Sequence, residues 1–224
     1  MRVPLPQAGG VSAGVALAPG HVAGRSPIVV LAPGAGSSRN HPSLAGIQTG
    51  LADAGWTTVT FDFPYREAGR RIPDRQPVLE RCWRAALDAV QADARLAPPW
   101  IAIGGRSMGG RIASHLAAAG APVNALVFLG FPLHPAGRPG VERAAHLPSI
   151  AVPMLFVQGT RDALAEPALL ASVLERLPRA TLHTIEGADH SFRVPKRGGR
   201  TEQTVRDEIV KVVADWLRSI QGGN

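Results

Sequence analysis

The chain has 224 residues, of which 45% are hydrophobic, with a formal net charge of +7 and one cysteine. These values predict a single globular α/β domain over residues 1–224, with residues 1–10 flexible, and they exclude an internal disulfide. The positive charge is almost wholly arginine. It lacks the mixed lysine and arginine runs with interleaved aromatic residues that nucleic-acid binders carry, so no nucleic-acid partner is expected.

The N-terminal stretch is predicted to be a strand rather than a targeting segment. Prolines and glycines interrupt residues 4–14, where a signal peptide needs a continuous apolar helix. We therefore expect a strand at residues 11–18. No later stretch approaches the ~18 apolar residues of a transmembrane helix, so no membrane partner is expected. Cys82 is expected in the core, and a lone cysteine fits a reducing, cytoplasmic compartment.

Short apolar runs then alternate with segments of helical periodicity. Strands are expected at residues 28–32, 57–61, 100–103, 125–129, 154–158 and 181–185, and helices at residues 42–54, 76–95, 108–119, 166–177 and 201–220. Nearly continuous apolar strands are typical of a parallel sheet that helices cover on both faces. The segment between the strands at 125–129 and 154–158 is too short for a large cap domain, so the site should be open.

Gly105, Ser107 and Gly109 form the pattern Gly-x-Ser-x-Gly between an expected strand and an expected helix. In a nucleophile elbow, this pattern places the serine on a strained turn, and the glycines let strand and helix approach closely. The pattern also occurs by chance in glycine-rich chains, as an ordinary serine in a strand-to-helix turn. The strand before it and the helix after it favour Ser107 as a nucleophile.

Asp162 and His190 each follow another expected strand, where ligands bind in sheets of this kind. A serine hydroxyl needs a base to accept its proton, and the histidine needs a carboxylate to orient its ring. Asp162 is the expected carboxylate. Asp189 is the alternative, disfavoured because neighbouring side chains on an extended loop point apart. The remaining histidines are expected to be structural or surface residues: His21, His41, His115, His134, His146 and His183.

Stabilising a developing oxyanion requires backbone donors. The N–H of Met108, directly after the serine, supplies one, and the second is expected from Ala35 in the loop after the first core strand. That glycine-rich loop matches neither of the nucleotide-binding patterns Gly-x-x-x-x-Gly-Lys-Ser/Thr and Gly-x-Gly-x-x-Gly. In addition, no Cys/His cluster in the sequence has zinc-ligand spacing. We therefore expect no cofactor and no metal.

Seven segments together carry a family resemblance. They are residues 32–36 (Ala-Pro-Gly-Ala-Gly), 63–65 (Phe-Pro-Tyr), 69–71 (Gly-Arg-Arg), 105–111 (Gly-Arg-Ser-Met-Gly-Gly-Arg), 131–135 (Phe-Pro-Leu-His-Pro), 158–162 (Gln-Gly-Thr-Arg-Asp) and 187–192 (Gly-Ala-Asp-His-Ser-Phe). The chain resembles the α/β-hydrolase superfamily, and within it the small lidless Tex30/KANL3-like group, which is related to dienelactone hydrolases. The resemblance covers nearly the whole chain after residue 11 and implies the α/β-hydrolase fold.

Two residues depart from what the resemblance implies. Pro33 stands where the group usually has a histidine, which leaves the shape of the oxyanion loop open. Ser107 stands where dienelactone hydrolases proper have a cysteine, so their substrate class is not implied.

Two functions remain open. The first is a serine hydrolase, of carboxylesterase type, that acts on a small ester or related acyl compound through Ser107, His190 and Asp162. The second is a protein-interaction module with this fold and little or no catalytic role. A binding role does not need all three residues, which favours the hydrolase. The expected partner is a small-molecule ester, and the expected state is a monomer or homodimer.

Arginines suggest an anionic substrate as one reading of the positive charge. They gather at Arg66, Arg70, Arg71 and Arg75, at Arg193, Lys196, Arg197 and Arg200, and on either side of the serine at Arg106 and Arg111. Charge near the mouth of the site could recruit anions. The alternative is a solvated surface on which the arginines pair with Glu67, Asp74 and Glu80.

Overall fold

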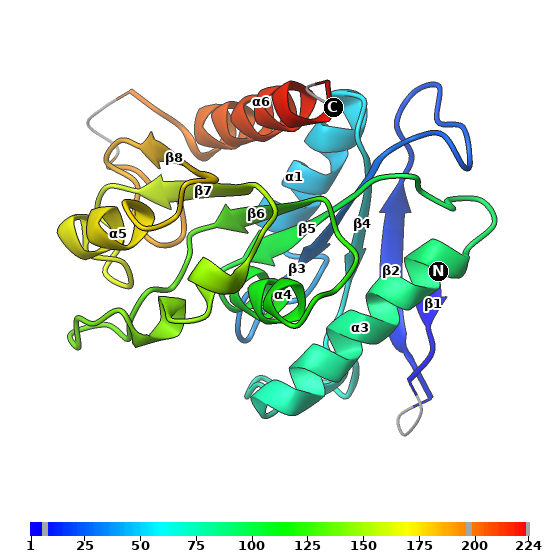
Figure 1. Cartoon of the computed structure of the whole chain (residues 1–224), viewed down its shortest axis with the longest axis horizontal. Coiled ribbons are helices and arrows are strands. Elements are labelled where there is room, and N and C mark those ends of the chain that lie inside the picture. The colour runs from blue at the N-terminus through cyan, green and yellow to red at the C-terminus, as the bar shows by residue number, and fades with distance from the viewer. Residues whose placement is uncertain (6–8, 196–198, 223–224) are drawn as a thin grey trace.

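The computed structural model describes residues 1–5, 9–195 and 199–222. One eight-stranded sheet has the strand order β1-β2-β4-β3-β5-β6-β7-β8 and carries helices on both faces (Figure 1). The strands from β4 through β8 in this order pair in parallel, whereas β2 pairs antiparallel with both β1 and β4. The predicted α/β class with a mostly parallel sheet is confirmed.

Each predicted strand and helix is present, with its ends shifted by a few residues at most. The strands are β1 (Arg2–Val3), β2 (Val11–Ala16), β3 (Ile28–Ala32), β4 (Thr57–Phe61), β5 (Ile101–Arg106), β6 (Ala125–Leu129), β7 (Met154–Gly159) and β8 (Ala180–Ile185). The helices are α1 (Pro42–Asp53), α2 (Pro64–Glu67), α3 (Gln76–Ala92), α4 (Met108–Ala118), α5 (Pro167–Leu174) and α6 (Glu202–Gln221). None of these helices is both long enough and apolar enough to cross a membrane.

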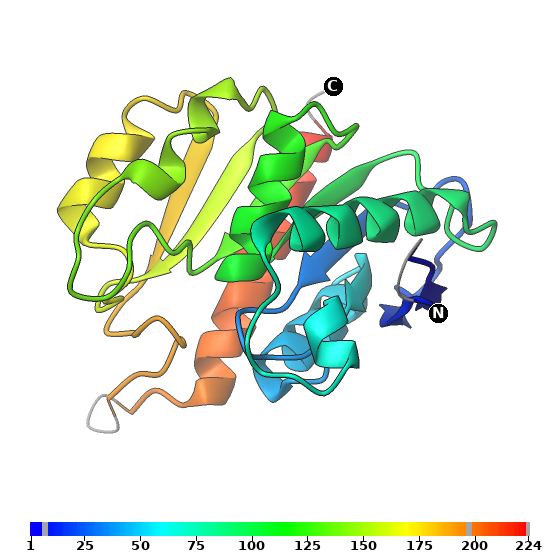
Figure 2. The same cartoon turned by 90° about the horizontal axis from the view of Figure 1, so that it is seen from below.

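The helices cover the sheet because each presents an apolar stripe to it. α1 and α6 pack together over one face, where Leu51 and Ile209 join the core. α3, α4 and α5 cover the other face, with Trp83, Ile112 and Leu170 in a second core. Seen from below, α3 and α4 lie in front of the sheet and α6 behind it (Figure 2). The strands from β3 to β7 are sandwiched between these layers.

The start of the chain, predicted to be flexible over residues 1–10, pairs with the sheet at Arg2 and Val3. Arg2 and Val3 pair with β2, and the Met1 amine donates a hydrogen bond to the Ala13 carbonyl oxygen at 2.9 Å. Val3 is buried in the core, which explains why this end is tied to the sheet. Residues 6–8 lie outside the described residues.

β5 continues past the predicted end at residue 103, through two glycines to Arg106. Gly104 pairs with Val127 and Gly105 with Phe128, and a Cβ at either glycine would overlap backbone of a neighbouring strand. Glycines normally weaken a strand, but here only glycine lets β5 pass between its neighbours. This extension places Ser107 beyond the carboxyl end of β5, a central strand of the sheet.

The loop between β6 and β7 forms no cap. It contains two 3₁₀ turns, η1 (Glu142–Ala144) and η2 (Leu147–Ser149). Leu147 is fully buried, and the His146 ring stacks on His115 of α4 with 3.9 Å between ring centroids. The segment therefore packs against α4, which leaves the carboxyl edge of the sheet open.

Candidate active site

Ser107 occupies a strained turn between β5 and α4. Its φ of 48° and ψ of −115° are values that residues other than glycine rarely adopt. The surrounding glycines make the turn possible, since a Cβ at Gly105 would overlap the Ala32 carbonyl oxygen and one at Gly109 would lie 2.6 Å from the Pro33 carbonyl oxygen. β5, α4 and the loop after β3 therefore meet around Ser107, as a nucleophile elbow requires.

His190 links Ser107 to Asp162. Its Nε2 lies 2.8 Å from Ser107 Oγ, and its Nδ1 lies 2.7 Å from Asp162 Oδ2. With the ring proton on Nδ1, the imidazole donates to the carboxylate and accepts from the hydroxyl. The structure thus brings the three predicted residues, which follow β5, β7 and β8, into one hydrogen-bonded chain.

The Asp162 carboxylate is fully buried and has two hydrogen-bond partners besides His190. Gln158 donates to its Oδ2 and the Leu164 N–H donates to its Oδ1 at 2.8 Å. Gln158 Oε1 in turn accepts from the Phe131 N–H at 2.8 Å, so it joins the loops after β6 and β7. Gln158 was not among the predicted residues. Its signal is a polar side chain near the end of an otherwise apolar strand.

Asp189 has a different task. Its Oδ1 accepts the backbone N–H groups of Ser191 and Arg193 at 2.7 and 2.9 Å. Its own N–H donates to the Arg193 carbonyl oxygen at 2.9 Å. These bonds close a tight loop that carries His190, and the His190 ring bonds to Asp162 instead. Asp189 shapes the loop and is not part of the chain through Ser107.

The two predicted oxyanion donors lie beside Ser107. Met108 is the first residue of α4, and Ala35 belongs to the loop after β3. A Cβ at Gly34 in that loop would lie 3.6 Å from the Ser107 Cβ, which shows how closely the loop approaches. Within the described residues, neither the Met108 nor the Ala35 N–H donates to another protein atom. Both remain available to a bound oxygen.

Tyr65, which the sequence marks only as part of the segment 63–65, holds this loop in shape. The Gly36 N–H donates to Tyr65 Oη at 3.1 Å, and the Tyr65 hydroxyl lies 3.5 Å from the Gly34 carbonyl oxygen. Tyr65 is fully buried on α2, a short helix between β4 and α3, and burial raises the pKa of its phenol. The neutral hydroxyl therefore braces the loop that contains Pro33.

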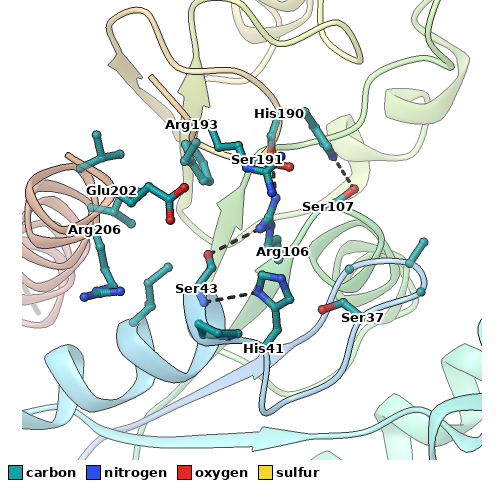
Figure 3. A pocket seen from close by; sticks show the side chains of 18 of the residues that line it. Ser37, His41, Ser43, Arg106, Ser107, His190, Ser191, Arg193, Glu202 and Arg206 are labelled. Atoms are coloured by element: carbon teal, nitrogen blue, oxygen red, sulfur yellow. Dashed lines mark hydrogen bonds between the residues drawn. The ribbon is translucent and has the colours of Figure 1, made fainter. Parts of the chain in front are cut away.

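A cavity of about 740 Å³ opens in front of Ser107. Its walls come from the loop after β3, the start of α1, the end of β5, the loop after β8 and the first turns of α6. Figure 3 shows Arg106 between the Ser107–His190 pair and the side chains of Glu202 and Arg206. His41, expected to be structural or surface, also lines this cavity.

The arginines separate into those inside and those outside the cavity. Arg106, Arg193 and Arg206 line it. Arg70 instead pairs with Asp74 at 2.7 Å, and Arg111 donates to Gln76 on the side of α4 that faces α3. Arg200 pairs with Glu208, while Lys196 and Arg197 lie outside the described residues. Arg206 is the one cavity arginine that the sequence analysis did not predict.

The other histidines and the cysteine contact groups remote from Ser107. His21 contacts Thr57, His134 accepts from the Glu166 N–H, and His183 contacts Glu208. Cys82 is buried, and burial raises the pKa of its thiol to about 12, as expected of an inert core residue. Among the residues placed in the structure, no group of three or more His, Cys, Asp or Glu side chains is arranged to hold a metal ion.

Solved structures share the fold over nearly their whole length. An α/β serine hydrolase homologue from Coxiella burnetii has a TM-score of 0.74 at 20% identity, covering 94% of this chain and 95% of that one. A dienelactone hydrolase from Anabaena variabilis has a TM-score of 0.77 at 21% identity, covering 98% and 95%. A lidless α/β serine hydrolase from Xanthomonas campestris has a TM-score of 0.72 at 22% identity, covering 96% and 93%.

These identities are low, so the likeness shows the fold alone. The sequence gives independent evidence, because residues 25–218 match the family described as an alpha/beta hydrolase domain. That match spans nearly all of the strands and helices described above. The chain belongs to the alpha/beta hydrolase domain family.

Proposed function

We propose that the protein is a serine hydrolase that cleaves small carboxylic esters or related acyl compounds through an acyl-enzyme. One observation carries the proposal. Ser107 Oγ, His190 and Asp162 form a continuous hydrogen-bonded chain that ends at the wall of an open cavity. A serine on a strained turn, beside a base that a buried carboxylate orients, is the arrangement that acyl transfer requires.

Each group has a step in the proposed reaction. Ser107 Oγ attacks the carbonyl carbon while His190 Nε2 takes its proton, and Asp162 stabilises the resulting imidazolium. The N–H groups of Ala35 and Met108 donate hydrogen bonds to the carbonyl oxygen and stabilise the negative charge that develops on it. His190 then gives the proton to the departing alcohol, which leaves an ester on Ser107. Water then attacks the acyl carbon while His190 Nε2 takes its proton. His190 returns this proton to Ser107 Oγ as the bond from Oγ to the acyl carbon breaks, which releases the acid and restores Ser107.

Two finer assignments are also proposals. We place the chain in the small lidless Tex30/KANL3-like group, supported by the seven segments above and by the absence of a cap between β6 and β7 among the described residues. We assign it to the cytoplasm, supported by its single, buried cysteine. The open cavity favours small or varied substrates over long lipids.

Labelling by a fluorophosphonate probe tests the proposal. The probe phosphonylates activated serines with loss of fluoride, so we expect the protein to be labelled at Ser107 and the Ser107→Ala variant to remain unlabelled. Small esters such as p-nitrophenyl acetate should compete with the probe. A folded protein that neither reacts with the probe nor hydrolyses these esters would instead support the protein-interaction role.

A further inference from the structure

The cavity beside Ser107 is lined by more cations than the proposed chemistry uses. Arg106 at the end of β5, Arg193 in the loop after β8 and Arg206 on α6 all line it, against one carboxylate, Glu202 (Figure 3). None of the three arginines takes part in the steps at the scissile carbonyl described above. They therefore need another explanation.

Arg106 enters the cavity with its charge unpaired. Its Nη2 donates to the His190 carbonyl oxygen at 3.1 Å, and its Nη1 lies 3.5 Å from Ser43 Oγ. In the described part of the chain, no carboxylate lies within 4.0 Å of its guanidinium. Burial lowers its pKa, with Asp189 opposing that effect. A guanidinium has five N–H donors, so this one keeps donors for a ligand.

The Arg206 side chain packs against α1 at Gly46. A Cβ at Gly46 would lie 2.6 Å from the Arg206 Cδ, so a larger residue there would displace the arginine stem. Gly46 is inside a helix, where glycine is unfavourable by about 1 kcal/mol relative to alanine. The glycine therefore makes room for the Arg206 side chain to pack against α1, and Arg206 also lines the cavity.

We propose that the substrate carries a carboxylate, which Arg106 binds beside Ser107 and which Arg206 and Arg193 attract into the cavity. The planar guanidinium fork matches a carboxylate in shape and charge. Glu202 in the same wall reduces the net positive charge, which favours a monoanion over a dianion. This inference rests on the proposed hydrolase function and names its substrate class.

Matched esters that differ only in one charge test the inference. The acyl-side pair is mono(p-nitrophenyl) adipate and its methyl ester, and the alcohol-side pair is 4-acetoxybenzoate and its methyl ester. Charge-assisted hydrogen bonds are stronger than neutral ones. We expect about a tenfold or larger advantage in kcat/KM for the anionic member of at least one pair. Which pair shows it tells whether the carboxylate sits on the acid or the alcohol.

Variants then assign the preference to the cavity. In Arg106→Gln and in Arg206→Gln, the ratio of anionic to neutral kcat/KM should fall by about tenfold. The ratio is the readout because Arg106 also holds the His190 carbonyl, so its loss lowers both rates. The matched control is Arg81→Gln, which removes one positive charge from the exposed side of α3 on the other face of the sheet. Its ratio should equal that of the wild type.

Failure of this inference can be told apart from failure of the proposed function. Equal kcat/KM within both pairs, in a protein that hydrolyses them, would overturn the carboxylate site and leave the hydrolase standing. If no ester turns over, calorimetry with the Ser107→Ala variant and the adipate monoester decides. Binding that Arg106→Gln weakens supports the site, and absence of binding overturns it. Absence of both turnover and probe labelling overturns the hydrolase itself.

Discussion

At the scale of residues, two neighbouring carboxylates have separate tasks. Asp162 accepts from His190 Nδ1 at 2.7 Å and is fully buried, whereas Asp189 accepts two backbone N–H groups of its own loop. Only Asp162 can fix which nitrogen of the imidazole carries the proton. At position 189, an asparagine keeps an acceptor oxygen for the two backbone N–H groups of the loop. At position 162, it lacks the negative charge that stabilises an imidazolium.

Asparagine substitution separates these tasks. Asp162→Asn should keep KM for a p-nitrophenyl ester near the wild-type value and lower kcat by about 10⁴-fold, because the ring loses its orienting carboxylate. Asp189→Asn should change kcat only a few-fold. Steady-state kinetics at pH 7 on both variants makes the comparison, and the reverse ranking would move the acid to Asp189.

Tyr65 offers a test of the oxyanion loop. Tyr65→Phe keeps the buried ring but removes the oxygen that accepts the Gly36 N–H. The loop that carries Ala35 should then hold the oxyanion less well, so we expect kcat to fall about tenfold with KM nearly unchanged. A lower melting temperature of Tyr65→Phe, with kcat unchanged at temperatures where the variant is folded, would indicate a structural role alone. Unchanged kcat would remove Tyr65 from the loop's support.

At the scale of elements, the packing of η2 on α4 depends on a neutral histidine. His146 stacks on His115, and its Nε2 lies 2.7 Å from Ser114 Oγ, which itself donates to the Arg111 carbonyl oxygen. Burial lowers the pKa of His146 to about 4, with His115 and Arg111 adding to the effect. In the unfolded chain, its pKa returns to about 6.5.

This difference predicts an acid-sensitive contact. Between pH 6.5 and about 4, the unfolded state binds a proton that the folded state does not, so the contribution of His146 is complete above pH 6.5 and is lost as pH falls. The melting temperature of wild-type protein should therefore drop more between pH 7 and pH 4.5 than that of His146→Gln, by about 3 °C. Parallel curves for the two proteins would show that His146 does not titrate in this way.

The elements also show which features sequence patterns can predict. Ser107, Asp162 and His190 were predictable because each follows a strand, and parallel strands end at the same edge of a sheet. Arg106 belonged to β5 although the pattern ended that strand earlier, because glycine propensity was overridden by the fit between β3 and β6. α2 was missed because a four-residue helix has no periodicity to detect.

At the scale of the whole molecule, the residues whose roles were missed are those whose partners come from distant parts of the chain. Gln158 bonds to Phe131, Tyr65 to Gly36, and Arg206 lies against Gly46. Such contacts depend on how loops close over the sheet, which local periodicity does not describe. The fold class and the proximity of Ser107, Asp162 and His190 were therefore predictable from the sequence, whereas the groups that support these residues and line the cavity required the structure.

Which of the arginines lie near Ser107 is also evident only from the folded structure. The sequence grouped Arg66, Arg70 and Arg71 with the site, yet Arg70 pairs with Asp74 and Arg66 donates to the Arg70 carbonyl oxygen. Of the arginines that the sequence grouped, Arg106 and Arg193 line the cavity, and Arg206 on α6 joins them. Most of the net charge of +7 is therefore distributed over the surface, and a small part of it faces Ser107.

The central claim is that Ser107 becomes acylated, and rapid mixing with p-nitrophenyl acetate measures this directly. We expect a burst of one p-nitrophenol per protein molecule before steady turnover, and an acetyl group on Ser107 in protein quenched with acid during that burst. Ser107→Ala should show neither the burst nor the adduct while keeping the wild-type circular dichroism spectrum. Turnover without an adduct on Ser107, or undiminished turnover in the alanine variant, would contradict the account.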